Sequence, residues 1–297
     1  MNVAVIKESR GDKIFNIVNG ALITLFVLVV LYPLYFVVIA SFSNPNLVAA
    51  GEVWFYPKSP TLDAYKTVFQ NNSIVTGYLN TIFYTVFGTL FNLALTLPAA
   101  YALSRRDLWG RKALMGLFVF TMFFSGGLIP IFLTVQELGL YNSFWVMVVP
   151  FSVSAYNVIV ARTFFETSLP PDLWDAAQID GCGNLRFFFT IALPLSKAVV
   201  SVIALWTAVG QWNCYFNALI YIRDERLYPL ALIMRNILVT QQIQSALGTG
   251  EAALIALRKA NLMRYAMIIV ATVPIMCVYP FVQKYFDQGV MIGAVKG

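Results

Sequence analysis

Six long apolar stretches constrain this chain more than any other feature of its sequence. A helix needs about 20 apolar residues to cross the roughly 30 Å of hydrocarbon in a bilayer. Stretches of about this length cover residues 14–40, 81–103, 113–135, 145–161, 199–221 and 265–282. Charged residues make up only 11% of the 297 residues, where a soluble domain would carry about a quarter. The sequence therefore predicts an all-α membrane protein with six transmembrane helices.

The first stretch follows the positive charges of Lys7, Arg10 and Lys13, as the apolar core of a signal peptide would. Its length of 27 residues exceeds the roughly 7–15 residues of such a core. We expect a retained membrane helix.

Lysine and arginine near the ends of the stretches predict the orientation, because they gather on the cytoplasmic side. The amino-terminal segment is basic, and so is the short loop 104–112, whereas the short loop 136–144 has no lysine or arginine. Both termini are then cytoplasmic. We divide the chain into a cytoplasmic segment (1–13), a six-helix domain (14–282) and a cytoplasmic tail (283–297).

The loop before the last stretch conflicts with this orientation, which places it outside the cell. It carries Arg223, Arg226, Arg235, Arg258, Lys259 and Arg264. Long loops follow the charge rule less closely than short ones. The short loops therefore decide the prediction, and the basic segment 251–264 is left unplaced.

The residues needed for chemistry are scarce. The chain has no histidine, and its three cysteines form no CxxC pair, which disfavours catalytic sites and metal sites. None of the six stretches contains Asp or Glu, the residues that mark proton and ion pathways in membranes. No basic stripe stands apart from the apolar stretches, so nucleic acid is not an expected partner. We expect neither an enzyme nor an ion-coupled carrier.

Proline and glycine interrupt several stretches. Pro33, Pro98, Pro150 and Pro274 lie inside four of them, and Ser125-Gly-Gly-Leu-Ile-Pro130 lies inside the third. They indicate either ordinary kinks for packing or a helix that bends as a path opens. The segment around Gly126 is the best candidate for such a bend.

The loop 164–198 has the pattern of a helix–turn–helix on the cytoplasmic face. Ser168 is a suitable N-cap, and Pro170 and Pro171 suit a first turn. Gly181 and Gly183 can end that helix. Such an element either lies along the lipid headgroups or docks a soluble partner.

The spacing in this loop resembles the EAA signature of the permease subunits of ABC importers. Asp175-Ala176-Ala177 is followed after three residues by Gly181, and after nine more by Ile191 and then Leu193-Pro194. The one departure is Asp175, where Glu is usual. The resemblance implies that the loop is the coupling helix, which sits in a cleft of an ATPase subunit. The contact residues that it implies are Asp175, Ala176, Ala177, Asp180, Gly181, Ile191, Leu193 and Pro194.

Other segments resemble the carbohydrate-uptake branch of that family. Asp180-Gly181, the run 193–196 and the ending 289–297 are similar to the smaller permease of maltose-type importers. Segments 125–130 and 279–285 resemble permeases for oligosaccharides and polysaccharide fragments. The implied function is half of a translocation path for a carbohydrate. A permease for a non-sugar solute and, further off, an ion-coupled secondary carrier are the alternatives.

The resemblance also implies the partners and the membrane. They are a second homologous permease, two ATPase subunits and an extracytoplasmic solute-binding protein, in the cytoplasmic membrane of a bacterium. ATP and Mg²⁺ are bound by the ATPase subunits, because this chain has no G-x-x-x-x-G-K-[ST] loop and no cofactor of its own.

The fifth stretch supplies candidates for the solute path, namely Trp206, Gln211, Asn213 and Asn217. Positions 206, 210, 213 and 217 share a face if the stretch is one helix. Amides and aromatic rings suit sugar hydroxyls and C–H faces. The alternative is hydrogen bonding between helices, which polar residues in membrane spans commonly provide.

Overall fold

The computed structural model describes residues 9–247, 263–278 and 280, with 240–247 described by their backbone alone. All regular structure in these residues is helical. The chain forms two compact units, one of residues 1–70 and 240–270 and the other of residues 71–239 and 271–297. We describe each unit by itself.

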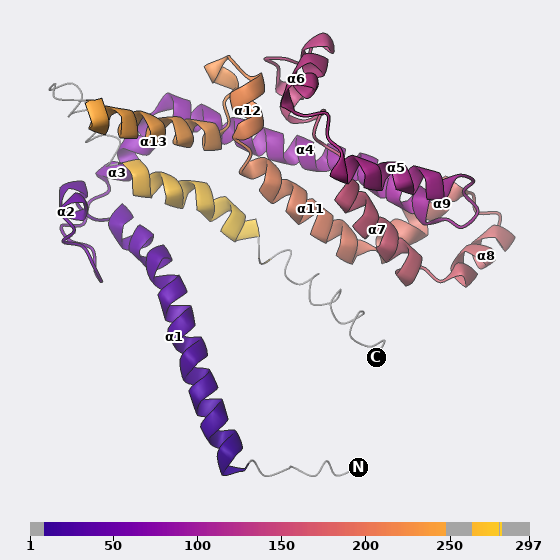
Figure 1. Ribbon diagram of the computed structural model, residues 1–297, viewed down its shortest axis with the longest axis horizontal. Helices are drawn as coiled ribbons and strands as arrows, with labels where there is room; N and C mark the ends of the chain where they lie inside the picture. Colours follow the sequence, from indigo (N-terminus) through magenta and orange to yellow (C-terminus); the bar gives the residue numbers. More distant parts are fainter. Residues whose placement is uncertain (1–8, 248–262, 279, 281–297) are drawn as a thin grey trace. The chain divides into compact units, whose positions relative to one another are not determined.

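Helix α1 (Arg10–Ser41) dominates the first unit and confirms the first predicted stretch as one helix (Figure 1). It begins with a capping box, in which the Ser9 hydroxyl accepts from the Asp12 N–H and the Asp12 carboxylate accepts from the Ser9 N–H. Its buried residues are the last three, from Ile39 to Ser41. Short helices α2 (Pro45–Ala49) and α3 (Asp63–Gln70) follow.

Helix α4 (Asn72–Ser104) is the axis of the second unit and contains the second predicted stretch. It begins before the predicted start at residue 81, because the Asn71 side chain accepts from the Ser73 N–H and caps an earlier turn. Two other helices pack along α4, α7 (Ala155–Ser168) and α11 (Lys197–Trp212).

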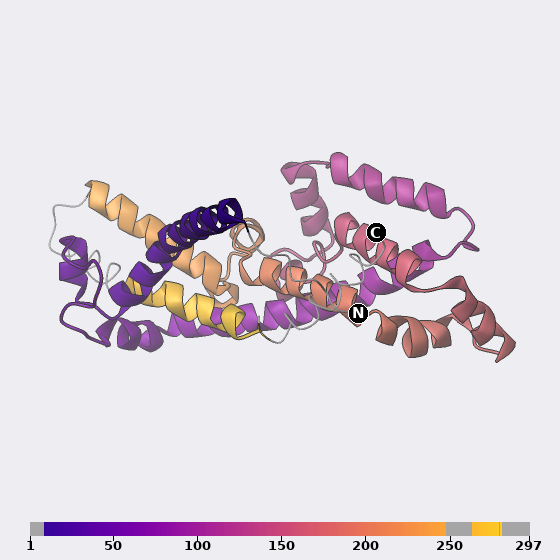
Figure 2. The same cartoon turned by 90° about the horizontal axis from the view of Figure 1, so that it is seen from below.

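The third predicted stretch is wrong as a single helix. It consists of α5 (Arg111–Phe123) and α6 (Leu128–Glu137), which meet at 115°. Figure 2 shows α6 turning sharply away from α5. The break lies at the Ser125-Gly126-Gly127 segment, and Gly127 takes a φ of +86° that other residues avoid. The physical cause is therefore the glycine pair that the sequence marked as a possible bend.

The fourth and fifth stretches are also interrupted. Residues 145–161 begin in the 3₁₀ turn η1 (Phe144–Met147), and α7 starts only at Ala155, after Pro150. The fifth stretch divides into α11 and α12 (Phe216–Tyr221). The described part of the sixth stretch lies in the helix Met263–Val278. Turn η3 (Glu225–Leu227) and α13 (Leu230–Leu247) precede it.

Length and composition alone qualify α1 and α4 as membrane spans among the described residues. The bent pairs α5–α6 and 184–212 would raise the number from 2 to 4 if each were one span. The predicted membrane class and all-helical fold therefore agree with the structure.

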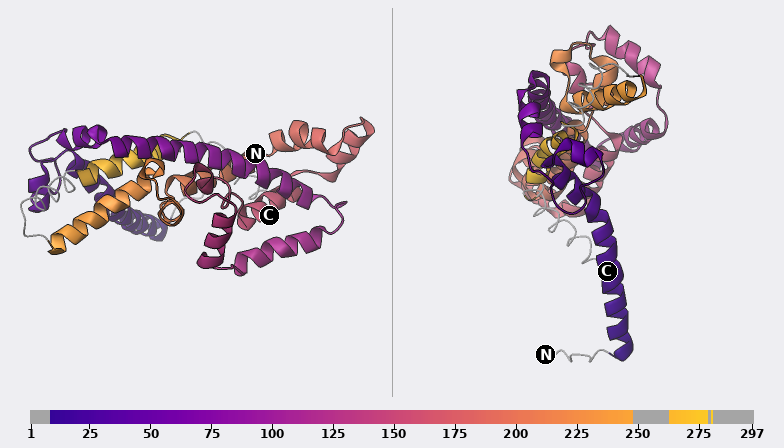
Figure 3. Two further views of the ribbon diagram at one scale, coloured as in Figure 1. Left: turned by 90° about the horizontal axis from the view of Figure 1, so that it is seen from above. Right: turned by 90° about the vertical axis from the view of Figure 1, so that its left-hand side faces the viewer.

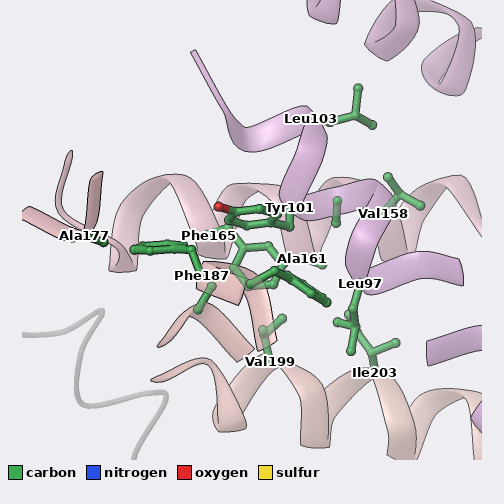
Figure 4. Close-up of a cluster of buried hydrophobic side chains, with 13 residues drawn as sticks. Leu97, Tyr101, Leu103, Val158, Ala161, Phe165, Ala177, Phe187, Val199 and Ile203 are labelled. Atoms are coloured by element: carbon green, nitrogen blue, oxygen red, sulfur yellow. The ribbon is translucent and has the colours of Figure 1, made fainter. Parts of the chain in front are cut away.

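Two hydrophobic clusters hold the second unit together. The Tyr101 cluster joins the end of α4 to α7, α8 (Pro171–Ile179) and the start of α11 (Figure 4). The Tyr84 cluster joins the first half of α4 to α6, η1, α12 and α13. Tyr84 and Tyr101 lie 17 residues apart on one helix, a rise of about 25 Å along its axis.

Candidate functional site

Helix α8 carries the Asp175-Ala176-Ala177 motif and projects beyond the end of α4 (Figure 3). The prediction that Ser168 caps this helix is wrong, because Ser168 is the last residue of α7. Pro170 takes the N-cap position and Pro171 the first helical position. Proline suits that position, where its missing N–H would have no helical partner in any case.

Gly181 ends α8 in the way that the sequence predicts. Its N–H donates to the Gln178 carbonyl at 3.0 Å, and the Cys182 N–H donates to the Ala177 carbonyl at 2.9 Å. This pair of bonds is a Schellman motif, which requires the left-handed φ of +71° that Gly181 adopts. The motif thus fixes where the chain turns back toward the second half of the loop.

The second half of the loop is a continuous but irregular helical run. It comprises α9 (Asn184–Phe187), a π-helical turn η2 (Phe188–Ala192) and α10 (Leu193–Leu195). This run meets α11 at 81°. The wide turn lies before Pro194, which has no N–H to donate to the helical ladder.

The structure divides the eight predicted contact residues into two groups. Asp175, Ala176, Asp180, Gly181 and Pro194 are exposed. Ala177 is buried, and Ile191 and Leu193 pack in part against the Tyr101 cluster. The motif therefore supplies both an outward face and an inward anchor.

Two further apolar side chains lie on the outside of this loop. Ile179 is 88% exposed and Leu185 is 77% exposed. Neither residue was among the predicted contact residues, although Ile179 directly precedes the Asp180-Gly181 pair of the motif. Together with Ala176 they make the outer side of the loop partly apolar, as a docking face requires.

Aromatic contacts connect the inner side of the loop to the long helices. The Phe187 ring packs edge-on against Trp174 of α8 at 5.0 Å, and stacks with Tyr101 of α4 at 6.3 Å. Tyr101 also contacts Phe165 of α7 at 5.8 Å (Figure 4). The Arg105 guanidinium lies 3.9 Å from the centre of the Trp174 ring. Displacement of α8 would therefore be passed directly to α4 and α7.

A polar groove of about 630 Å³ lies beneath α8. On its wall, Glu166 accepts hydrogen bonds from Arg111 at 3.2 Å and Arg162 at 2.7 Å. Arg162 also donates to the Leu103 carbonyl at 3.2 Å, and Arg111 donates to the Ser104 carbonyl at 3.3 Å. This network ties α5 and α7 to the end of α4.

Replacement of Glu166 by alanine should destabilise this network. The two arginine side chains are only 22% and 26% exposed, and they would lose their shared carboxylate. We expect the free energy of unfolding to fall by about 1–2 kcal/mol, between the values for exposed and buried ion pairs. Thermal unfolding of the purified complex would measure this. Lys66→Ala, which removes a largely exposed ion pair with Asp63, should change the unfolding free energy little. Equal changes in the melting temperature of the two variants would contradict the stabilising role of the Glu166 network.

Asp107 forms a second ion pair at the groove. The Arg105 Nε and Nη2 donate to its carboxylate at 3.0 and 3.1 Å. These hydrogen bonds are the largest cause of a pKa below the usual value for Asp107, and burial acts in the opposite direction. The ionised carboxylate is therefore favoured by the fold.

A lowered pKa makes the contribution of Asp107 depend on pH. Its contribution to folding stability is complete above the pKa of the carboxyl in the unfolded chain, about 3.8. The contribution is lost as the pH falls through the lower pKa of the folded protein. Asp107→Asn should therefore lower stability at pH 7 by no more than about 1 kcal/mol, because the carboxylate is largely solvated. The melting temperatures of the wild type and of Asp107→Asn should therefore converge as the pH is lowered from 7 to 3. A difference that widens toward acid would contradict this.

The predicted solute-path residues do not share one surface. Trp206 is half exposed and lies 5.7 Å from the Tyr156 ring. Gln211 points inward, where its Nε2 donates to the Met147 carbonyl at 3.2 Å and its side chain packs at Gly88 of α4. Asn213 is the C-cap of α11, and its Nδ2 donates to the Val209 carbonyl of that helix at 2.9 Å. The predicted common face is wrong for Asn217, because α11 ends at Trp212 and Asn217 lies on α12.

The described residues offer little for chemistry of their own. No group of three or more His, Cys, Asp or Glu side chains among them is arranged to hold a metal ion. What the fold presents is a set of apolar membrane helices and a helical loop with an exposed face. These features are those of an all-helical membrane protein.

The chain belongs to the family described as binding-protein-dependent transport system inner membrane component, whose model matches residues 73–292. This match confirms the predicted ABC-importer class. A transporter of this class includes an ATPase and a solute-binding protein beside the permease. ATP and Mg²⁺ therefore belong to another subunit, and this chain is not the enzyme.

Relatives of known sequence cover nearly the whole chain. A polygalacturonan/rhamnogalacturonan transport system permease, YtcP of Bacillus subtilis, is 38% identical over 96% of this chain and 99% of its own. Protein LplC of Bacillus subtilis is 36% identical over 98% and 97%. A chain in the crystal structure of a bacterial ABC transporter involved in the import of the acidic polysaccharide alginate is 34% identical, with a TM-score of 0.86. That match covers 95% of this chain and 100% of the other.

Proposed function

We propose that this chain is the smaller permease subunit of an importer for an oligosaccharide. The observation that carries the proposal is the relatedness over almost full length to permeases named for polygalacturonan or rhamnogalacturonan and for alginate. More distant relatives are named for galactooligosaccharides and arabinooligosaccharides. These names share the class of carbohydrate oligomers. They support a sugar chain over the non-sugar alternative.

We propose six membrane crossings, and the positions of the two clusters support four of them. Four segments each reach from one cluster to the other, and they are α4, α5 with α6, η1 with α7, and α11 with α12. Helix α1 and the helix Met263–Val278 supply the remaining two crossings. In this proposal the interrupted helices cross in pieces, and the six-helix domain has the limits 14–282.

Both termini lie in the cytoplasm in this proposal, with tails 1–13 and 283–297. The Tyr101 cluster then marks the cytoplasmic end of the second unit, where Arg105, Arg106, Arg111 and Lys112 gather. The Tyr84 cluster marks the outer end. Arg223 and Arg226 adjoin that outer end, where Asn80 donates to the Arg226 carbonyl. The basic residues at 251–262 lie outside the described residues.

The loop 164–198 is the coupling element in this proposal. Two ATPase subunits dock under this chain and a second homologous permease, and one of them receives α8. The exposed residues Asp175, Ala176, Asp180 and Gly181 form the contact face, and Ala177, Ile191 and Leu193 hold the loop on the Tyr101 cluster. ATP-driven closure of the ATPases would move α8, and the aromatic contacts would move α4 and α7 with it.

A role in the solute path is proposed for Trp206 and Asn213 alone of the four predicted residues. Both are exposed, Trp206 on α11 and Asn213 directly after its last residue, about two helical turns apart. Gln211 instead serves helix packing, as its bond to Met147 supports. Asn217 is not included, because it lies on α12 and not on the face of Trp206.

Uptake into proteoliposomes tests the proposal. The chain would be co-expressed with its partner permease, ATPase and binding protein, and supplied with labelled oligogalacturonides. We expect uptake that requires internal ATP and the binding protein, and that resists ionophores. Uptake abolished by an ionophore without ATP dependence would restore the ion-coupled carrier. Uptake of peptides but no sugar would overturn the substrate class.

A further inference from the structure

Three consecutive aromatic residues stand exposed in the first unit. Trp54, Phe55 and Tyr56 are 62%, 67% and 66% exposed, in the loop between α2 and α3. This is an unusual amount of aromatic surface for a loop that is otherwise well anchored. The coupling function does not use it.

The loop is held against the side of α1. The Tyr32 hydroxyl donates to the Trp54 carbonyl at 3.2 Å, and the Tyr35 hydroxyl donates to the Phe55 carbonyl at 2.5 Å. Figure 1 shows the chain after α2 running back beside the end of α1. The aromatic residues therefore lie level with Tyr32 and Tyr35, not beyond the end of the helix.

Other bonds fix the base of the loop at the end of α1. The Thr61 N–H donates to the Phe42 carbonyl at 2.8 Å, and the Asn44 N–H donates to the Lys58 carbonyl at 3.1 Å. Val53 is buried. The Trp54 indole N–H donates to the Gly51 carbonyl at 2.8 Å, so its polar edge is satisfied within the loop. What remains outward is the ring surface of Trp54 and Phe55, together with the Tyr56 ring and its hydroxyl.

The positions of Tyr32 and Tyr35 along α1 indicate how deep the loop lies in the bilayer. The 19 residues from Lys13, the last charge before the apolar run, to Tyr32 rise about 28 Å, close to the thickness of the hydrocarbon layer. Tyr32 and Tyr35 then lie at the far boundary of that layer. Tryptophan and tyrosine are enriched at this depth, where a ring meets the acyl chains and its polar edge meets the headgroups.

We propose that the Trp54–Tyr56 loop is a membrane anchor, which inserts its three rings into the interface of the outer leaflet beside α1. The assignment to the outer leaflet rests on the orientation proposed above, whereas the insertion of the rings does not. Lys58, paired with Glu52 at 3.3 Å, lies at the headgroup level and suits the lipid phosphates. The anchor would set the height of α1 in the bilayer.

Depth measurement by spin labelling tests the anchor without touching the native cysteines. p-Acetylphenylalanine would replace Phe55, or Leu62 as a matched control, and carry a nitroxide in the full transporter in liposomes. Leu62 is 55% exposed but adjoins Thr61 at the end of α1. Collision rates with lipid-soluble oxygen and with water-soluble nickel chelate give the depth.

We expect the oxygen-to-nickel collision ratio at position 55 to exceed that at position 62 several-fold. Tyr35→Phe, which removes the bond to the Phe55 carbonyl, should lower the ratio at 55. Equal ratios at both positions would overturn the anchor. Protection of position 55 from both reagents only when the binding protein or the sugar is added would also overturn it, in favour of a docking or sugar surface. ATP-dependent uptake by the same liposomes reports separately on the proposed function.

Discussion

Phe187→Ala should give the largest loss of stability of any single change in the loop. Phe187 is 2% exposed and contacts both Trp174 of α8 and Tyr101 of α4. Truncation of a buried phenylalanine costs about 3–5 kcal/mol, since both apolar burial and packing are lost. The thermal midpoint of the purified complex should fall accordingly. Uptake per ATP hydrolysed should fall too, because α8 would lose its aromatic connection to α4.

Phe189→Ala is the matched control for this prediction. It removes the same atoms two residues away, from a side chain that is 60% exposed. Its effect on the thermal midpoint should be small, as for most surface substitutions. If both variants lowered the midpoint and the coupling ratio equally, Phe187 would have no special part in transmission.

Gly181→Asp should abolish most of the stimulation of ATP hydrolysis by the binding protein. Gly181 has a φ of +71° at the end of α8, where any side chain strains the backbone. A Cβ there would meet nothing within 4 Å inside this chain. The loss would therefore come from the strain and from a carboxylate placed on the outward face. We expect the stimulation of ATP hydrolysis to decrease about tenfold or more, and a factor of ten is equivalent to about 1.4 kcal/mol.

Two variants separate these causes. Gly183→Asp places the same carboxylate two residues on, at an ordinary φ of −80° and in open space. It should keep most of the stimulation. Gly181→Asn matches aspartate in shape and tolerance of the left-handed region but adds no charge. Unchanged hydrolysis in Gly181→Asp, with the variant present in the membrane, would remove Gly181 from the docking face.

The apolar stretches predicted the fold class well because membrane helices must satisfy their own backbone groups. Where a stretch has no strong breaker, as around residues 14–40, the helix is continuous despite Pro33. The breaks at Gly126-Gly127 and after Trp212 could not be located by hydropathy. Local apolar content is the same for a straight helix and for one bent by 115°.

At the candidate site, too, the sequence predicted local features but not the contacts between distant segments. Spacing alone located the motif, and the glycine turn at residue 181 followed from backbone chemistry. The connection through Tyr101, Trp174 and Phe187 joins residues up to 86 positions apart, which no local pattern reveals. The assignment of Asn217 to the face of Trp206 failed because it assumed one unbroken helix.

Photo-crosslinking from Ile179 tests the central claim, that the outward face of α8 docks an ATPase subunit. Ile179 is 88% exposed at the end of α8, and a benzophenone amino acid there would sample its immediate neighbour. Ile129 of α6, 72% exposed, gives a control position far along the chain from the loop. The account predicts a crosslink to the ATPase from position 179 in the assembled transporter, and none from position 129. Crosslinks from position 179 to lipid alone, in a complex that still binds its ATPase, would contradict it.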